Sequence, residues 1–135
     1  MVIGGQHPFA RDQSGMRQWL RDGMAGGGDV LISDCERMVG PLSDGLASRL
    51  RSADLEAYLA AAHDRIAIED VLKTMAMPSC LYAGEADPIF MEAKLASERI
   101  PDSRFFAIPG LAHLPAFVAS SNVLPPVMAF LHSIP

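Results

Sequence analysis

The sequence predicts an α/β fold in which about three parallel strands accompany a separate helical segment. Two short apolar runs, 79–83 and 104–108, are each followed by a turn or loop and then by a helical pattern, which is the order that builds a parallel sheet. A third apolar run opens the chain at residues 1–5. Residues 11–65 instead carry apolar side chains at the spacing of four short helices, separated by glycine and proline.

Taken in order, the first strand is expected at residues 1–5, where Val2 and Ile3 lead into a glycine pair. The four helices that follow are expected to be separated at Gly26–Gly28, at Gly40–Pro41 and at Ala53–Asp54. Their inward faces are expected to consist of apolar residues at helical spacing: Met16, Trp19, Leu20, Met24, Val30, Leu31, Met38, Val39, Leu46, Leu50, Leu55, Leu59 and Ala62.

The second half is expected to alternate between helix and strand. Residues 68–75 are expected to form a short helix or linker, and residues 88–100 a full helix after the first long strand. The last helix should turn Val123, Val127, Phe130 and Ile134 inward, and Pro125–Pro126 predicts that it is kinked or starts at that pair. We therefore divide the chain into a core strand fragment (1–10), a cap-like helical segment (11–65) and a β-α-β-α part (66–135).

Composition limits the classes of function. The chain has 135 residues, 50% of them hydrophobic and 20% charged, which excludes disorder as a description of the whole. Its net charge of −5 argues against nucleic acid and an anionic membrane surface as partners, and favours a small molecule or another protein. Cys35 and Cys80 form no metal or disulfide motif, and no signal peptide is evident, so a cytoplasmic location is expected. The uncharged stretch 105–135 is too interrupted by proline and polar residues to span a membrane.

Two motifs follow the predicted strands. Gly84-Glu-Ala-Asp87 comes after the first long strand, and Pro109-Gly-Leu-Ala-His113 comes after the second. Ligands of parallel sheets bind at this carboxyl edge. A neutral imidazole, with a pKa of about 6.5, accepts a proton there, and a carboxylate on its other nitrogen fixes the tautomer. The plainer alternatives are that Asp87, which precedes Pro88, begins a helix and that His113 is a loop histidine bonded to the backbone.

The order of these motifs resembles the C-terminal part of the α/β-hydrolase superfamily, in which a strand ends in G-x-x-D and a later loop presents a histidine. The resemblance implies a catalytic acid at Asp87, a catalytic base at His113 and a variable helical cap over residues 11–65. It also implies hydrolysis of a small apolar ester- or lactone-like substrate, without a metal or another cofactor.

The nucleophile expected from that resemblance is missing, because no G-x-S-x-G motif occurs in the chain. The nearest approach is Pro41-Leu-Ser43-Asp-Gly45, where no strand precedes and Ser43 is favoured as a helix cap. We therefore expect the chain to begin after the nucleophile helix and to be completed by an N-terminal half. The alternative is a catalytically silent, truncated fold that acts through self-association, as a homo-oligomer, or through a partner chain.

Two other patterns carry little weight. The order His7, His63–Asp64 and Asp87 matches that of metal-dependent phosphohydrolases, but those ligands lie on helices, whereas His7 and Asp87 follow predicted strands. Gly26–Gly28 lacks the lysine and the hydroxyl residue of a phosphate-binding loop. His63 is expected to be a solvated residue after the last helix of the helical segment.

Overall fold

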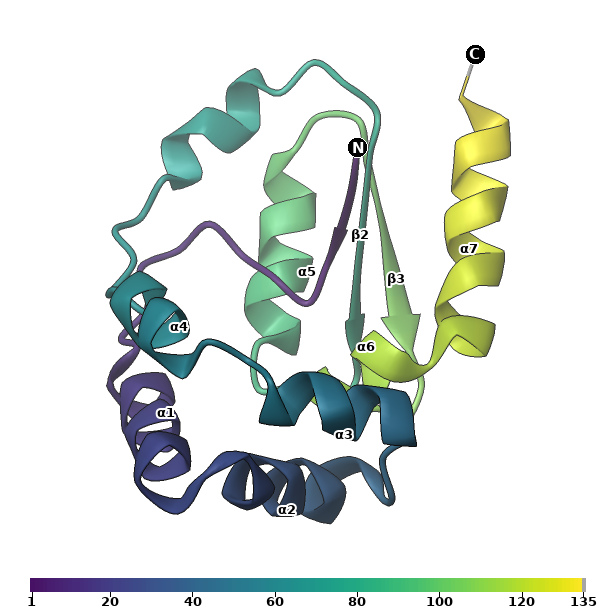
Figure 1. The fold of residues 1–135 in the computed structure, drawn as a ribbon. Helices are drawn as coiled ribbons and strands as arrows, with labels where there is room; N and C mark the ends of the chain where they lie inside the picture. Colours follow the sequence, from purple (N-terminus) through teal and green to yellow (C-terminus); the bar gives the residue numbers. More distant parts are fainter. Residues whose placement is uncertain (135) are drawn as a thin grey trace. The chain divides into compact units, whose positions relative to one another are not determined.

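The computed structural model describes residues 1–134, which fall into two compact units. The first unit combines Met1–Phe9 with the residues from Ala67 onward, and the second is Ala10–Ile66. Strands and helices alternate in the first unit, whereas the second is helical (Figure 1). No helix within residues 1–134 is both long enough and apolar enough to cross a membrane.

The first unit is built on a parallel sheet with strand order β1-β2-β3 (Figure 1). The strands are β1 (Val2–Gly4), β2 (Ser79–Gly84) and β3 (Ser103–Ile108). Every residue of β2 pairs in parallel register with a residue of β3, and β1 pairs in parallel with β2. The predicted fold class is confirmed, because the sheet has three parallel strands accompanied by helices.

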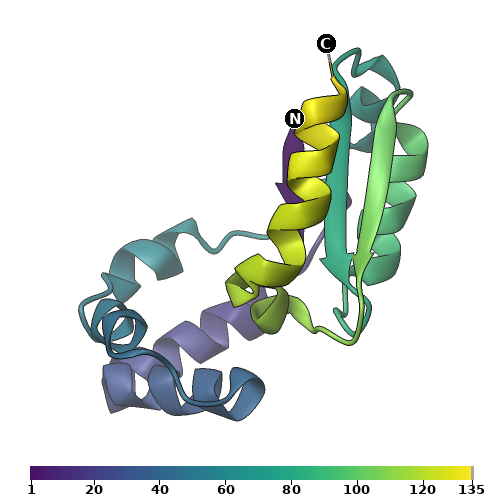
Figure 2. The same ribbon diagram turned by 90° about the vertical axis from the view of Figure 1, so that its right-hand side faces the viewer.

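Helices cover both faces of this sheet, which explains why every residue of β2 except Tyr82 is buried (Figure 2). On one face lies α5 (Phe90–Arg99), and the core there combines buried residues with partly buried ones: Leu72, Leu81, Ala96 and Ile100 with Ile3, Phe9, Met75 and Phe105. On the other face lies α7 (Ser120–Ser133), whose Phe130 is 2% exposed and packs beneath the Arg104 guanidinium.

The remaining elements of the first unit are short. A 3-10 helix, η1 (Glu69–Thr74), precedes β2, and α6 (His113–Val118) precedes α7. The prediction that the last helix starts at the proline pair is wrong, because α7 begins at Ser120 and runs through Pro125 and Pro126. The carbonyl groups that lose their helical partners to these prolines belong to an exposed turn, where water can bind them.

The second unit contains the four predicted helices. They are α1 (Ser14–Gly26), α2 (Gly28–Val39), α3 (Asp44–Arg51) and α4 (Leu55–Ala61). Arg17 of α1 donates a hydrogen bond to Asp64 beyond α4, over 2.6 Å, and thereby ties the start of the unit to its end. This hydrogen bond holds the pKa of Asp64 below its usual range.

The packing of α1 on α2 differs in part from the predicted inward stripes. Leu20 and Leu31 are buried as expected. Three of the residues predicted to face inward are exposed: Met16, Met24 and Met38. Gly23 is buried instead, because the Leu31 side chain occupies the space beside it. A β-carbon at Gly23 would be 2.4 Å from Cδ2 of Leu31. A helical spacing pattern scores glycine as neutral, so it misses a helix contact made through glycine.

At the end of β2, Gly84 allows the loop after β3 to lie directly across the strand. A β-carbon at Gly84 would be 2.0 Å from the carbonyl oxygen of Leu111. The same carbonyl accepts a hydrogen bond from the Ala86 amide over 3.0 Å, which holds the loop in place. Backbone groups therefore hold the loop directly against β2, and this contact leaves no room for a side chain at position 84.

We predict that Gly84→Ala lowers the free energy of unfolding by about 1–3 kcal/mol, because the added methyl group forces the loop off the strand end. Urea denaturation of the 135-residue chain measures this loss. Gly45→Ala is the matched control, since a β-carbon at Gly45 in α3 meets nothing within 4 Å. The control should leave stability unchanged or slightly raised. A loss below about 0.5 kcal/mol for Gly84→Ala would contradict the packing described here.

Candidate active site

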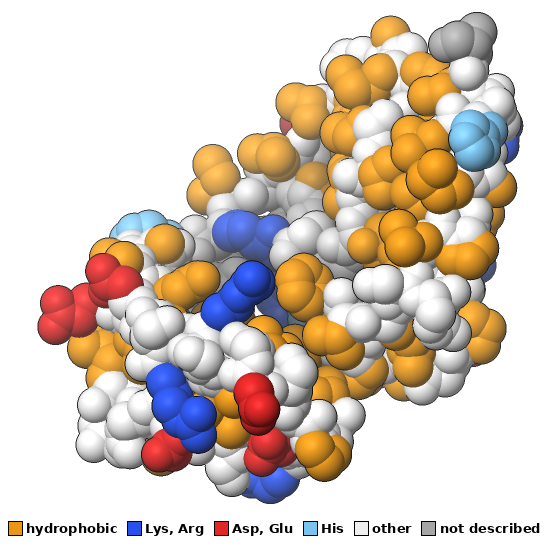
Figure 3. Space-filling model, turned by 45° about the vertical axis from the view of Figure 1, so that its right-hand side comes forward, with side chains coloured by type: hydrophobic (Ala, Val, Ile, Leu, Met, Phe, Trp, Pro, Cys, Tyr) orange, Lys and Arg blue, Asp and Glu red, His pale blue; other side chains and the backbone are white. Residues whose placement is uncertain are grey.

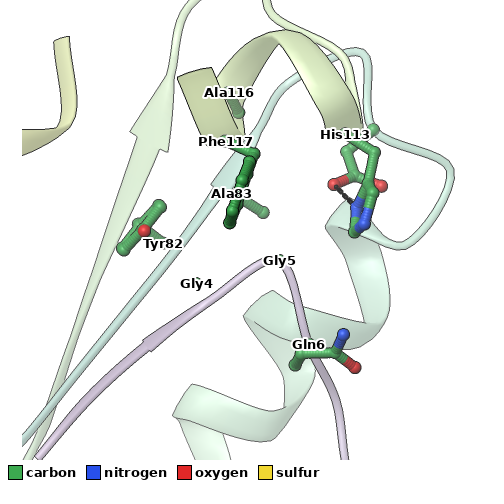
Figure 4. A pocket seen from close by; sticks show the side chains of 9 residues that line it. Gly4, Gly5, Gln6, Tyr82, Ala83, His113, Ala116 and Phe117 are labelled. Atoms are coloured by element: carbon green, nitrogen blue, oxygen red, sulfur yellow. Dashed lines mark hydrogen bonds and ion pairs between the residues drawn. The ribbon is translucent and has the colours of Figure 1, made fainter. Parts of the chain in front are cut away.

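The two residues singled out by the sequence motifs meet at the carboxyl edge of the sheet. Asp87 lies in the turn after β2, and His113 is the first residue of α6, after β3. Nδ1 of His113 is 2.8 Å from Oδ2 of Asp87 (Figure 4). The Asp87 side chain is 1% exposed and that of His113 is 51% exposed. A buried carboxylate thus holds one side of an imidazole that remains open to solvent.

Asp87 uses its two carboxylate oxygens for different purposes. Oδ1 accepts a hydrogen bond from the Ile89 amide over 3.0 Å, close to the start of α5. Oδ2 faces His113. The turn itself is closed by the Asp87 amide, which donates to the Gly84 carbonyl over 3.0 Å. Asp87 is therefore not the N-cap of α5, which is Ile89. Its side chain instead bonds the turn before the helix and faces the histidine.

A cavity of about 230 Å³ opens beside the pair. It is lined by residues from the ends of β1 and β2, from the segments that follow these two strands and from α6: Gly4, Gly5, Gln6, Tyr82, Ala83, Asp87, His113, Ala116 and Phe117. Figure 4 shows His113 at one side of this pocket and Tyr82 at the other, with Phe117 between them. Apart from Gln6, Asp87 and His113, the walls are apolar or aromatic.

Sequence analysis missed the lining contributed by β1 and by Tyr82. Tyr82 is opposite Gly4 in the register of the sheet, and a β-carbon at Gly4 would be 2.2 Å from Cζ of the tyrosine ring. The ring therefore lies over the glycine. The sequence predicts only that Gly4 and Gly5 end a strand. The strand register is needed to place Gly4 under the ring of Tyr82.

The described residues that line the pocket include no Ser, Thr or Cys. Ser43 is the N-cap of α3, as favoured from the sequence, and its hydroxyl accepts from the Leu46 amide. The two cysteines, Cys35 and Cys80, are free and buried, and burial raises the pKa of each thiol. A thiol whose pKa is raised is a poor nucleophile at neutral pH.

The cytoplasmic location expected from the sequence stays a prediction.

The metal-site alternative finds no support in the geometry. Nδ1 of His7 accepts a hydrogen bond from the Phe9 amide over 3.2 Å, and the two rings are stacked. His63 is exposed after α4. Within residues 1–134, no three or more side chains of His, Cys, Asp or Glu are placed to hold a metal ion together.

No protein-family model and no curated protein matches the chain by sequence. Solved structures do match it. A bromoperoxidase from Bacillus anthracis has a TM-score of 0.72 at 16% identity, over 98% of this chain and 57% of that one. The esterase RhEst1 from a Rhodococcus species has a TM-score of 0.74 at 19% identity, over 99% and 56%.

A third match is MGS-M2, an alpha/beta hydrolase from a Medee basin deep-sea metagenome library. Its TM-score is 0.71 at 16% identity, over 100% of this chain and 56% of that one. This chain thus spans little more than half the length of the structures it matches. At such identities the likeness establishes the fold, so the chain has an α/β-hydrolase fold over about half of that fold's length.

Proposed function

We propose that the chain is the C-terminal part of an α/β-hydrolase-type enzyme and that Asp87 and His113 are the acid and base of its catalytic triad. The observation that carries the proposal is the 2.8 Å contact between His113 and a buried Asp87, beside a pocket at the carboxyl ends of parallel strands. Ligands bind at this edge of open α/β sheets. This geometry supports the proposed roles of the two residues.

In the proposed reaction, Nδ1–H of His113 donates to Asp87, which leaves the lone pair of Nε2 to accept a proton from the nucleophile. The nucleophile attacks the ester carbonyl, and the imidazolium then protonates the departing alkoxide. Water attacks the acyl-enzyme in the second step, again losing its proton to Nε2. The bond between the acyl group and the nucleophile then breaks, the imidazolium returns the proton to the nucleophile, and the carboxylic acid leaves. The negative charge of Asp87 stabilises the imidazolium in both steps, and no metal or cofactor takes part.

We infer that the nucleophile belongs to a complementing N-terminal half, docked at the free edge of β1. The Met1 carbonyl accepts from Cys80, and the Gly5 amide donates to Tyr82. Because backbone groups alternate along a strand, those of Val2 and Gly4 point away from β2. This edge offers hydrogen bonds to another parallel strand. The coverage of 54–57% of the matched structures supports the same inference.

The proposed substrate is a small ester or lactone with an apolar acyl group. Tyr82, Ala83, Ala116 and Phe117 supply an apolar wall next to the acid–base pair. A cavity of about 230 Å³ suits a short acyl chain better than a polymer. Several of the matched structures are esterases by name, which agrees with this substrate class.

For a polypeptide that contains this chain and the segment preceding it, we predict hydrolysis of p-nitrophenyl butyrate. His113→Ala should lower kcat/KM by at least about a thousandfold, because the base is lost. Asp87→Asn should cause a loss in the same direction, because the amide no longer fixes the imidazole tautomer. Steady-state kinetics measure both effects.

His132→Ala is the matched control for this prediction, since His132 is an exposed histidine on α7, outside the pocket lining. It should leave kcat/KM unchanged. The 135-residue chain by itself should be inactive. Hydrolysis by that chain alone, abolished by His113→Ala, would reject the inferred external nucleophile, and equal losses for His113→Ala and His132→Ala would reject the triad.

A second candidate function is self-association, and the uncovered face of α7 favours it. Apolar side chains gather on the face of the first unit where α7 lies (Figure 3). Leu124, Met128 and Leu131 of α7 are 55%, 43% and 41% exposed. No Asp, Glu, Lys or Arg occurs from Phe105 to the end of the sequence, so α7 itself contributes no such charged side chain to this surface.

If the chain acts by association, the isolated 135-residue protein should form a dimer or larger species at tens of micromolar. Sedimentation velocity measures this directly. The double substitution Leu124→Glu and Leu131→Glu should restore the monomer, because each adds a charge to the apolar face. The same change at two exposed serines, Ser120→Glu and Ser121→Glu, is the control for added charge alone on α7. A wild-type chain that stays monomeric would contradict this candidate.

A further inference from the structure

We propose that Gly5 is a positioning residue, which keeps the His113 imidazole on Asp87 by presenting a backbone without a side chain to the ring. A β-carbon at Gly5 would be 3.2 Å from Cε1 and 3.3 Å from Nδ1 of His113, and 3.9 Å from Oδ2 of Asp87. These atoms belong to the edge of the imidazole that bonds the carboxylate, and to the carboxylate itself. A side chain at position 5 would therefore displace the imidazole and weaken its hydrogen bond to Asp87.

The position of Gly5 is fixed by the sheet. Its amide donates to the Tyr82 carbonyl over 2.9 Å, next to the last register pair of β1 and β2. Its φ of +55° lies in the left-handed region, which L residues rarely adopt. The chain therefore ends β1 by bending toward the site, and Figure 4 shows this bend facing the imidazole of His113.

The consequence concerns the tautomer of the histidine. Nδ1 is held between Asp87 and the backbone of Gly5. Donation from Nδ1 to the carboxylate leaves Nε2 unprotonated, which is the form that a general base requires. Displacement of the ring by a methyl group weakens that donation and releases the imidazole to the Nε2–H tautomer. The catalytic meaning of this constraint rests on the proposed function.

Gly110 provides a matched control for backbone strain. Its φ is +68°, close to that of Gly5, and a β-carbon there would meet nothing within 4 Å. It also lies in the loop that leads to His113. Alanine at either position introduces the strain of a positive φ, but only alanine at position 5 places an atom against the ring.

The experiment is ¹⁵N NMR of histidine-labelled 135-residue protein at a pH of about 8, where an ordinary histidine is neutral. His113 is identified by the signals that His113→Asn removes. Wild type and Gly110→Ala should show the Nδ1–H tautomer. Gly5→Ala should move at least half of His113 to the Nε2–H tautomer, while circular dichroism remains that of wild type. An unchanged tautomer in Gly5→Ala, or an equal change in Gly110→Ala, overturns the proposal.

A second variant covers the case in which Gly5→Ala does not fold. Asparagine tolerates a positive φ better than alanine and still carries a β-carbon, so Gly5→Asn should show the same change of tautomer. Retention of the Nδ1–H form by a folded Gly5→Asn overturns the proposal. The measurement needs no turnover. An altered tautomer together with a longer polypeptide that hydrolyses no ester would therefore reject the proposed function and leave the positioning role intact.

Discussion

The hydrogen bond between Asp87 and His113 is the constraint on which the site depends. It joins the turn after β2 to the first residue of α6, so it connects the ends of two adjacent parallel strands. The carboxylate is buried, and a buried carboxylate needs partners for both oxygens. The Ile89 amide and the imidazole supply them. One side chain thus bonds both the turn that leads into α5 and the histidine.

Three glycines leave room for this arrangement in different ways. Gly84 lets the histidine loop cross the end of β2, Gly4 accommodates the ring of Tyr82, and Gly5 faces the imidazole. In each case a β-carbon would come within 3.2 Å of another group. The backbone at the carboxyl edge is therefore packed against the site as closely as side chains are packed in a core.

Much of the fold, and the contact between Asp87 and His113, could be predicted from the sequence. Apolar runs and turn residues predict the strands and their ends from local sequence. Parallel pairing of the strands then brings the two motifs at their ends together. The exposure of Met16, the burial of Gly23 and the start of α7 before Pro125 could not be predicted, because they depend on which surfaces meet in space. The contribution of β1 to the pocket depends on strand register in the same way.

The central claim is that this chain supplies the acid and base, while the nucleophile lies in a preceding segment. The most direct test is to react the longer polypeptide with a fluorophosphonate and to locate the covalent label by mass spectrometry. The label should lie on a residue before Met1, and His113→Ala should slow labelling by at least about a hundredfold. A label within residues 1–135, on Ser43 for example, or a rate that His113→Ala does not change, would contradict the claim.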